Sequence, residues 1–388
     1  MEISDNLNII KKYIIPILKN TDFIKQNKIN TLNKLDKIFF LIKKYITKIS
    51  KTNYNVTANN IITYPLSLDK NDNKFVPEVI TNIIFNKITI QYKFTIKINN
   101  RKINIYISDK NKIKKEKIDN ILQFILTIIN VFDELSSKEL YNLDIFLYLT
   151  NVKKLFPKNK YDILTKTNVN SGYTSYFTNN HREIVIYREE ELFKVLIHEL
   201  IHYYDFDIKT TINFMENKLF IKNCLKMYGE TYTDIWARIL NIMFIAVKKT
   251  NNYNDYLKFF EISLYIEILF SYFQGFKTLN HFNITYEMLR SKIYKINNYK
   301  ESSNGYCYYV LPSIILMNLD VFLDFCITNN KKNFIDFNNN NNNNNNNNHK
   351  SFILLILKIL NSNEFKNIEQ SLSKYSIKNN TMRMSIIE

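Results

Sequence analysis

The stretch that decides the fold is "REIVIYREEELFKVLIHELIHYYD", residues 182–205. Its first six residues, 182–187, are mostly β-branched or aromatic and predict a strand. An apolar run with helical spacing follows, and neither Gly nor Pro separates the two. The acidic residues 189–191 are expected to form a solvated helix start, where negative charge complements the helix dipole. The sequence therefore predicts a strand that leads directly into a helix.

The predicted helix carries two of the five histidines of the chain, His198 and His202. Residues four apart lie on the same face of a helix, so the two imidazoles can converge on one metal ion. Glu199 points about 100° away from His198 around the axis, which places its carboxylate beside the ion. A zinc-activated water needs a proton acceptor at that position. The motif therefore predicts a zinc site with Glu199 as general base.

A catalytic zinc ion usually has three protein ligands and one open position. "YGETYTDIWARILN", residues 228–241, supplies a candidate third ligand in Glu230. Asp234 follows one helical turn later on the same face, where a carboxylate can accept the second N–H of a liganding imidazole. We therefore expect Glu230 to bind the metal and Asp234 to support the site.

HELIH followed by a helix with E-x-x-x-D resembles the gluzincin group of zinc metallopeptidases, to which thermolysin belongs. The resemblance implies an α+β fold with a zincin-like catalytic domain, a small mixed sheet whose edge strand packs on the HExxH helix. It also implies a role for each motif residue. His198, His202 and Glu230 would be the zinc ligands, Glu199 the base and proton shuttle, and Asp234 the partner of His198.

This resemblance covers at most residues 144–250. It suggests that strand 182–187 is an edge strand along which an extended substrate peptide lies by β-addition. More loosely, the chain is similar to predicted metallopeptidases of large DNA viruses with AT-rich genomes. One departure is Gly229, where thermolysin-like enzymes have Asn, so the partner of His202 is unassigned.

Other ligand sets stay open. A metzincin needs Gly three residues and a ligand six residues after His202, where this chain has Asp205 and Ile208, so that group is excluded. Asp205 or Asp207 would be the third ligand in an aspartate-type zincin. The plainest alternative is that His198 and His202 are buried polar residues satisfied by their neighbours.

Peptide hydrolysis also needs a donor that stabilises the oxyanion. The candidates are His281 and the tyrosines of "NGYCYYVLPS", residues 304–313, and among these we favour Tyr308 as a catalytic residue.

Composition limits the class of protein. The 388 residues are 46% hydrophobic, which is enough for a large core, and the net charge is +17. Of the 53 basic residues only six are Arg, and the lysines are spread along the chain, which favours a solvated surface over nucleic-acid binding. Three cysteines without CxxC spacing indicate a reducing compartment. We expect an intracellular, cytoplasmic protein without a membrane span, in the host cytoplasm or the virion if it is viral.

Along the chain we expect three parts. Residues 1–112 would form N-terminal helices and a β-hairpin at 87–108, and residues 113–275 the zincin-like core. Residues 276–388 would be a helical C-terminal region with a disordered poly-Asn loop at 338–348. The zincin-like domain would thus carry helical N- and C-terminal extensions.

The expected function is zinc-dependent hydrolysis of a peptide bond, with a peptide or protein as substrate and Zn²⁺ as cofactor. One alternative is a catalytically inactive zincin-like protein that uses the site only to bind a partner. A second is a Lys-rich nucleic-acid-binding protein, which the absence of Arg clusters and nucleic-acid motifs disfavours. The oligomeric state is left open.

Overall fold

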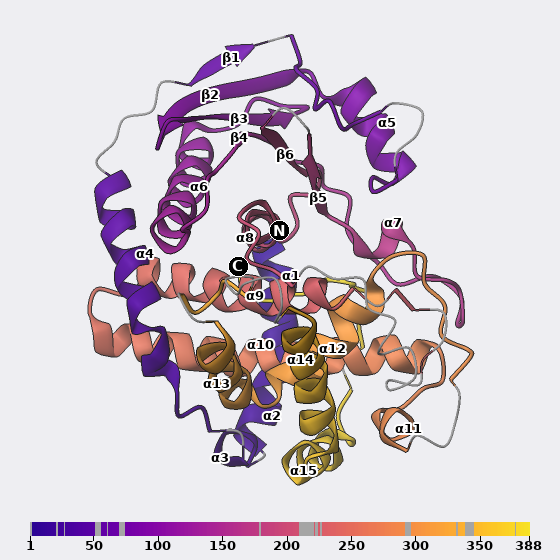
Figure 1. The fold of residues 1–388 in the computed structure, drawn as a ribbon. Helices are drawn as coiled ribbons and strands as arrows, with labels where there is room; N and C mark the ends of the chain where they lie inside the picture. Colours follow the sequence, from indigo (N-terminus) through magenta and orange to yellow (C-terminus); the bar gives the residue numbers. More distant parts are fainter. Residues whose placement is uncertain are drawn as a thin grey trace. The chain divides into compact units, whose positions relative to one another are not determined.

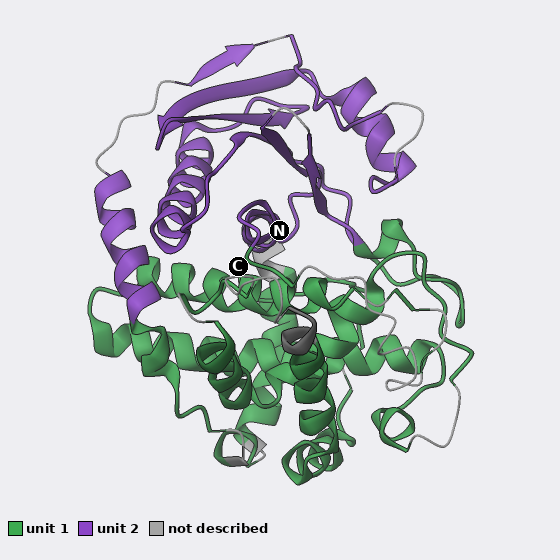
Figure 2. Ribbon diagram, viewed as in Figure 1, with its two compact units in different colours: residues 1–36, 155–169, 206–388 green, residues 37–154, 170–205 purple. Residues whose placement is uncertain are grey.

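The structure is a computed structural model with two compact units (Figures 1 and 2). It describes residues 2–20, 22–26, 28–50, 56–59, 61–69, 74–177, 180–208, 221, 224–225, 227–291, 296–330, 333–337, 345–376 and 378–388. The sheet unit comprises Lys37–Lys154 and Asn170–Asp205. The helical unit comprises Met1–Asp36, Leu155–Val169 and Phe206–Glu388. The division of the chain into 1–112, 113–275 and 276–388 stays a prediction.

The sheet unit contains an open, mixed six-stranded sheet in the order β1-β2-β3-β4-β6-β5. The strands are β1 (Thr57–Asn59), β2 (Ile90–Ile98), β3 (Arg101–Asp109), β4 (Asn142–Tyr148), β5 (Gly172–Tyr176) and β6 (His181–Ile186). β3, β4 and β6 run parallel to one another, whereas the other neighbouring pairs are antiparallel. Together with the helices described below, this sheet confirms the α+β class.

The predicted hairpin at 87–108 is confirmed as β2 and β3. Ile98 pairs with Arg101, and the two residues between them, Asn99 and Asn100, have φ values of 48° and 63°. A two-residue hairpin loop with both φ values positive matches the twist of its strands, and Asn tolerates this conformation. The local sequence was therefore sufficient to predict this turn.

The predicted edge strand is wrong. The strand that starts at 182 is β6, which lies between β4 and β5, so it has a neighbour on both sides. All its residues from Arg182 to Ile186 are buried, as expected for an interior strand. The edge strand next to β6 is β5, whose sequence GYTSY is more polar and more exposed, and β1 lies at the opposite edge. Among the described strands, the sheet edge beside the HExxH helix is therefore Gly172–Tyr176.

Helices cover both faces of this sheet (Figure 1). Those of the sheet unit are α4 (Asp36–Ile49), whose first residue belongs to the helical unit, α5 (Glu78–Lys87), α6 (Lys115–Leu135) and α8 (Leu192–Tyr203). α6 and α8 lie on one face, and α8 contacts both β5 and β6. On the other face, Ile80 and Ile84 of α5 pack with aromatic residues of β4 and β5. The HExxH helix is thus held against the edge of the sheet.

The start of α8 differs from the solvated helix start that we expected. The side chains of Glu191 and Lys154 are fully buried and form an ion pair, and the backbone N–H of Lys154 donates to Glu190 at 2.9 Å. Burial lowers the pKa of Lys154, and the carboxylates of Glu191 and Glu190 oppose this effect. Buried charges require partners, and no local pattern in the sequence showed that Lys154 would provide one.

The helical unit packs its longest helices around a common core. Its elements are α1 (Glu2–Ile9), η1 (Ile10–Ile14), α2 (Ile15–Asn20), α3 (Phe23–Gln26), η2 (Leu32–Leu35), α7 (Lys166–Val169), α9 (Tyr228–Lys249), α10 (Tyr253–His281), α11 (Tyr286–Arg290), η4 (Tyr306–Val310), α12 (Leu311–Leu316), α13 (Leu319–Asn329), α14 (Asn345–Asn361) and α15 (Asn363–Leu372). α9, α10, η4 and α12 contact one another. Trp236 of α9 is fully buried against Phe322 and Phe334, as a core residue should be.

The poly-Asn tract is only partly described. Residues 338–344 lie outside the described residues, and α14 begins at Asn345. The last four asparagines therefore belong to a helix and not to the expected loop.

No single helix in the described part of the chain is long and apolar enough to cross a bilayer. One pair bent by 100°, Tyr306–Leu316 with Leu319–Asn329, passes this test by length and composition only.

Candidate metal centre

Two imidazoles of α8 face one another. His198 is buried, His202 is half-buried, and their Nε2 atoms lie 3.1 Å apart. Two nitrogens bound to one tetrahedral zinc ion at 2.0–2.1 Å would be separated by about 3.3 Å. The observed separation is that of a hydrogen bond between the two rings, and it is also close to the spacing that a shared zinc ion would need.

Glu199 is held by the edge strand. Its side chain is buried, and its Oε2 accepts a hydrogen bond of 2.8 Å from the hydroxyl of Thr174 on β5. The same hydroxyl lies 3.1 Å from the backbone carbonyl oxygen of Glu199. The carboxylate predicted to act as the base is thus oriented by a neighbouring strand as well as by its own helix.

Two arginines anchor the end of α8. Arg101 of β3 donates to the hydroxyls of Tyr203 and Tyr204 at 2.6 and 2.7 Å. Arg182 of β6 donates to the backbone carbonyl of Tyr203. A cation here satisfies a terminal carbonyl and complements the negative end of the helix dipole. Arg182 also binds the carboxylate of Asp205 at 3.1 Å.

Glu230 lies in the first turn of α9 in the helical unit. Its Oε2 accepts a hydrogen bond of 2.7 Å from the hydroxyl of Tyr308, a residue of η4. The hydroxyl of Thr231 donates to the carbonyl of Cys307 at 2.9 Å, which ties the same two elements together. The contact of Tyr308 is thus to the candidate third ligand, and its predicted role as oxyanion donor stays a prediction.

Asp234 is fully buried one turn further along α9. Its Oδ2 accepts a hydrogen bond of 2.7 Å from Arg238, which also donates to Glu267 at 3.1 Å and to the carbonyl of Tyr308 at 3.2 Å. These contacts place Asp234 in a buried charge network within the helical unit. Its predicted support of His198 stays a prediction.

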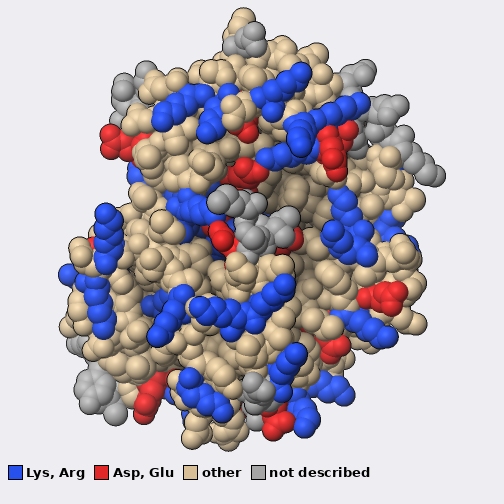
Figure 3. Space-filling view, turned by 180° about the vertical axis from the view of Figure 1, so that it is seen from behind, with Lys and Arg blue, Asp and Glu red and all other residues tan. Residues whose placement is uncertain are grey.

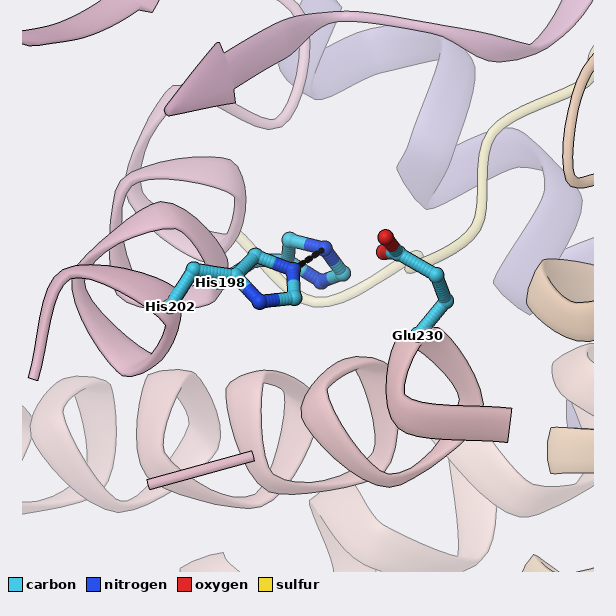
Figure 4. Close-up of side chains that lie close together, drawn as sticks. All are labelled: His198, His202 and Glu230. Atoms are coloured by element: carbon cyan, nitrogen blue, oxygen red, sulfur yellow. Dashed lines mark hydrogen bonds between the residues drawn. The ribbon is translucent and has the colours of Figure 1, made fainter. Parts of the chain in front are cut away.

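Among the described residues, one set of three side chains has the composition of a metal site: His198, His202 and Glu230. Figure 4 draws these three side chains, the two imidazoles from α8 of the sheet unit and the carboxylate from α9 of the helical unit. Two nitrogens and one carboxylate oxygen match the donor set of a catalytic zinc ion with one open position. The set includes neither Asp205 nor Asp207.

Sequence reasoning missed the residues that orient the predicted ones. Thr174 was hidden in a short polar strand, and Arg101 and Arg182 have no motif around them. The contacts of Thr174, Arg101 and Arg182 with α8 become visible only when their strands are paired in the sheet beside this helix. His281, the other oxyanion candidate, has its Nε2 2.8 Å from the backbone oxygen of Asp162.

Charged side chains are spread over the face of the described residues that Figure 3 draws. On the face drawn in Figure 3, Lys and Arg side chains are scattered, with Asp and Glu among them. This distribution agrees with the solvated lysines expected from the sequence and does not favour a nucleic-acid interface.

Comparisons with known proteins leave the function open. No family model and no solved structure matches the chain. The chain is similar to an uncharacterized protein of Acanthamoeba polyphaga mimivirus, with 26% identity over 259 residues. The match covers 62% of this chain, which spans 63% of the length of the viral protein. This likeness loosely supports a relation to viral proteins and shows no peptidase family.

Proposed function

We propose that the protein is a zinc-dependent peptide hydrolase with a zincin-like catalytic domain. The observation that carries the proposal lies within the sheet unit, where the imidazoles of His198 and His202 converge on one face of α8 and the carboxylate of Glu199 is held beside them by Thr174. The two imidazole nitrogens lie 3.1 Å apart, a hydrogen-bond distance that is also close to the separation of two nitrogens on one tetrahedral zinc ion. The motif, the donor set and the position of the helix at a sheet edge support the same reading.

Zinc at these ligands would supply Lewis acidity, which polarises the scissile carbonyl and makes water easier to deprotonate. Glu199 would accept the proton from the attacking water and deliver it to the leaving nitrogen. Glu199 is buried beside His198, and burial would limit loss of the transferred proton to solvent before it reaches the leaving nitrogen. Tyr308 would hold Glu230 in the orientation that a ligand needs.

The edge strand β5 supports a peptide substrate. Thr174 and Tyr176 of this strand hydrogen-bond to α8, and the strand pairs with β6 on one side only. An extended peptide can add to such an edge through backbone hydrogen bonds, while pockets beside the strand select its side chains. We therefore propose an extended peptide or protein segment as substrate.

The test begins with metal content. The purified protein, grown with sufficient zinc and passed through a mild chelator, should hold about one zinc per chain by elemental analysis. His202→Ala and Glu230→Ala should lose it, whereas His281→Ala, a histidine outside the set, should keep it. Zinc retained by Glu230→Ala would move the third ligand elsewhere, with Asp205 and Asp207 next to examine.

Activity is then measured against a peptide library. The unsubstituted protein should cleave peptides, and Glu199→Gln should retain zinc but lose cleavage. Stoichiometric zinc without cleavage would instead favour a binding protein that retains only the metal site. Binding to DNA or RNA that depends steeply on salt and is unaffected by Glu199→Gln would favour the nucleic-acid alternative.

A further inference from the structure

We propose that Thr174 is a positioning residue that holds the carboxylate of Glu199 in its working orientation. This inference rests on the proposed hydrolase function, because Glu199 is the base of that reaction. Its evidence lies entirely within the sheet unit, in the contacts between β5 and α8.

The hydroxyl of Thr174 has one hydrogen and two acceptors within reach. Oε2 of Glu199 is at 2.8 Å and the backbone oxygen of the same residue is at 3.1 Å. An ionised carboxylate is the stronger acceptor, and its hydrogen bonds are shorter than those of neutral groups. The hydroxyl should therefore donate mainly to Oε2.

The strand keeps this hydroxyl at a fixed distance from the helix. Thr174 pairs with Ile184 of β6, and as a β-branched residue it has a restricted χ1 angle. Tyr176, two residues along on the same face, donates to the backbone carbonyl of His202 at 3.0 Å. Gly172 allows close packing, because a Cβ atom there would lie 3.0 Å from Val195 of α8. The strand thus meets the motif helix at Glu199 and at His202.

A glutamate needs this kind of support. Its side chain has three rotatable bonds, and a proton acceptor that is misplaced by an ångström can lose roughly 100-fold in rate. A sheet strand is a more rigid support than a loop. Because the edge strand is fixed in the sheet, the hydrogen bond from Thr174 fixes the orientation of the Glu199 carboxylate.

The first experiment reads the carboxylate directly, in protein labelled with ¹³C at the side-chain carboxyl of glutamate. The Glu199 resonance is assigned by its disappearance in Glu199→Gln. Thr174→Val removes the hydroxyl at nearly constant shape and should shift this resonance, whereas Thr174→Ser should keep it near its original position. Tyr176→Phe removes the other hydrogen bond between strand and helix and should leave the resonance unmoved. An unmoved resonance in Thr174→Val, or an equal shift in Tyr176→Phe, would overturn the inference.

The second experiment measures the effect of Thr174 on the rate of peptide cleavage. With a peptide identified in the library, Thr174→Val should lower kcat roughly 10- to 100-fold, with KM within about twofold and zinc content unchanged. Thr174→Ser should recover most of kcat. A kcat for Thr174→Val equal to that of the unsubstituted protein would contradict the inference even if the resonance shifts. If the unsubstituted protein cleaves nothing, the hydrolase proposal fails, and the resonance still decides whether Thr174 holds Glu199.

Discussion

At the scale of single residues, two hydroxyl groups hold the two carboxylates of the candidate centre. Thr174 donates to Glu199 within the sheet unit, and Tyr308 donates to Glu230 within the helical unit. Each hydrogen bond is charge-assisted and restricts a flexible glutamate to one orientation. Neither hydroxyl belongs to the HExxH or ExxxD pattern, so the support of these carboxylates is a property of the folded chain.

If Glu230 is a zinc ligand, Tyr308→Phe should weaken zinc binding by about tenfold, because loss of a hydrogen bond to a metal ligand typically costs 10- to 100-fold in affinity. The change is measured by competition with a chromophoric chelator. Tyr309→Phe is the matched control, since the hydroxyl of Tyr309 donates to the backbone carbonyl of Met382. Equal zinc affinity in the protein with and without Tyr308→Phe would argue against Glu230 as ligand.

At the scale of elements, the first turn of α9 is packed tightly against the segment before it. A Cβ atom on Gly229 would lie 2.4 Å from the backbone oxygen of Ile208, a distance that no side chain can occupy. This is the position at which thermolysin-like enzymes have Asn. The departure therefore has a physical reason: the chain before α9 takes the space of that side chain and leaves only glycine.

Gly229→Ala should destabilise the fold by about 1–3 kcal/mol, since backbone atoms must shift to admit the methyl group. In an open helix the same change would be stabilising by about 1 kcal/mol, because Ala has the higher helix propensity. The sign of the change in the free energy of unfolding, measured with urea, therefore shows whether the contact between Gly229 and Ile208 is tight. A stabilised Gly229→Ala protein would mean that the contact with Ile208 is relaxed in solution.

At the scale of the whole molecule, two half-buried ionisable groups of the helical unit, Glu301 and Lys277, should make stability depend on pH. Burial raises the pKa of Glu301 from 4.5 to about 7, although N–H groups of Tyr306 and Leu225 donate to it. Burial lowers the pKa of Lys277 from 10.5 to about 7, while its Nζ donates to the carbonyl of Thr381 at 2.8 Å. Both groups favour their neutral form in the folded protein.

The signs of the two effects are opposite. A glutamate with a raised pKa stabilises the fold fully below pH 4.5, and that contribution is lost as pH rises to about 7. A lysine with a lowered pKa stabilises the fold fully above pH 10.5, and that contribution is lost as pH falls to about 7. Each slope is at most about 1.4 kcal/mol per pH unit.

Urea unfolding across the pH range tests this prediction against two variants. The stability difference between the unsubstituted protein and Glu301→Gln should decrease from about pH 5 to about pH 7 and then level off. The difference from Lys277→Met should increase from about pH 7 to about pH 10. Differences that do not vary with pH would show that these groups are solvated in the folded protein.

Local pattern determined a large part of the secondary structure. The hairpin at 87–108 with its turn at Asn99 and Asn100, the strand that starts at 182, and the helix that carries HELIH follow from side-chain periodicity and from backbone preferences of single residues. The spacing of His198 and His202 follows from the helix itself, because four residues make about one turn. These features depend on residues that are close together in the chain, and therefore they can be predicted from the sequence alone.

Only the tertiary structure decided what depends on distant neighbours. Strand order makes β5 and not β6 the edge, a buried Lys154 turns an expected solvated helix start into an ion pair, and Thr174 reaches Glu199 across two elements. Periodicity within one strand or helix shows which face is apolar but not which segment covers it. Strand pairing and burial depend on contacts between segments that are far apart in the chain. Only the folded structure shows which segments make these contacts.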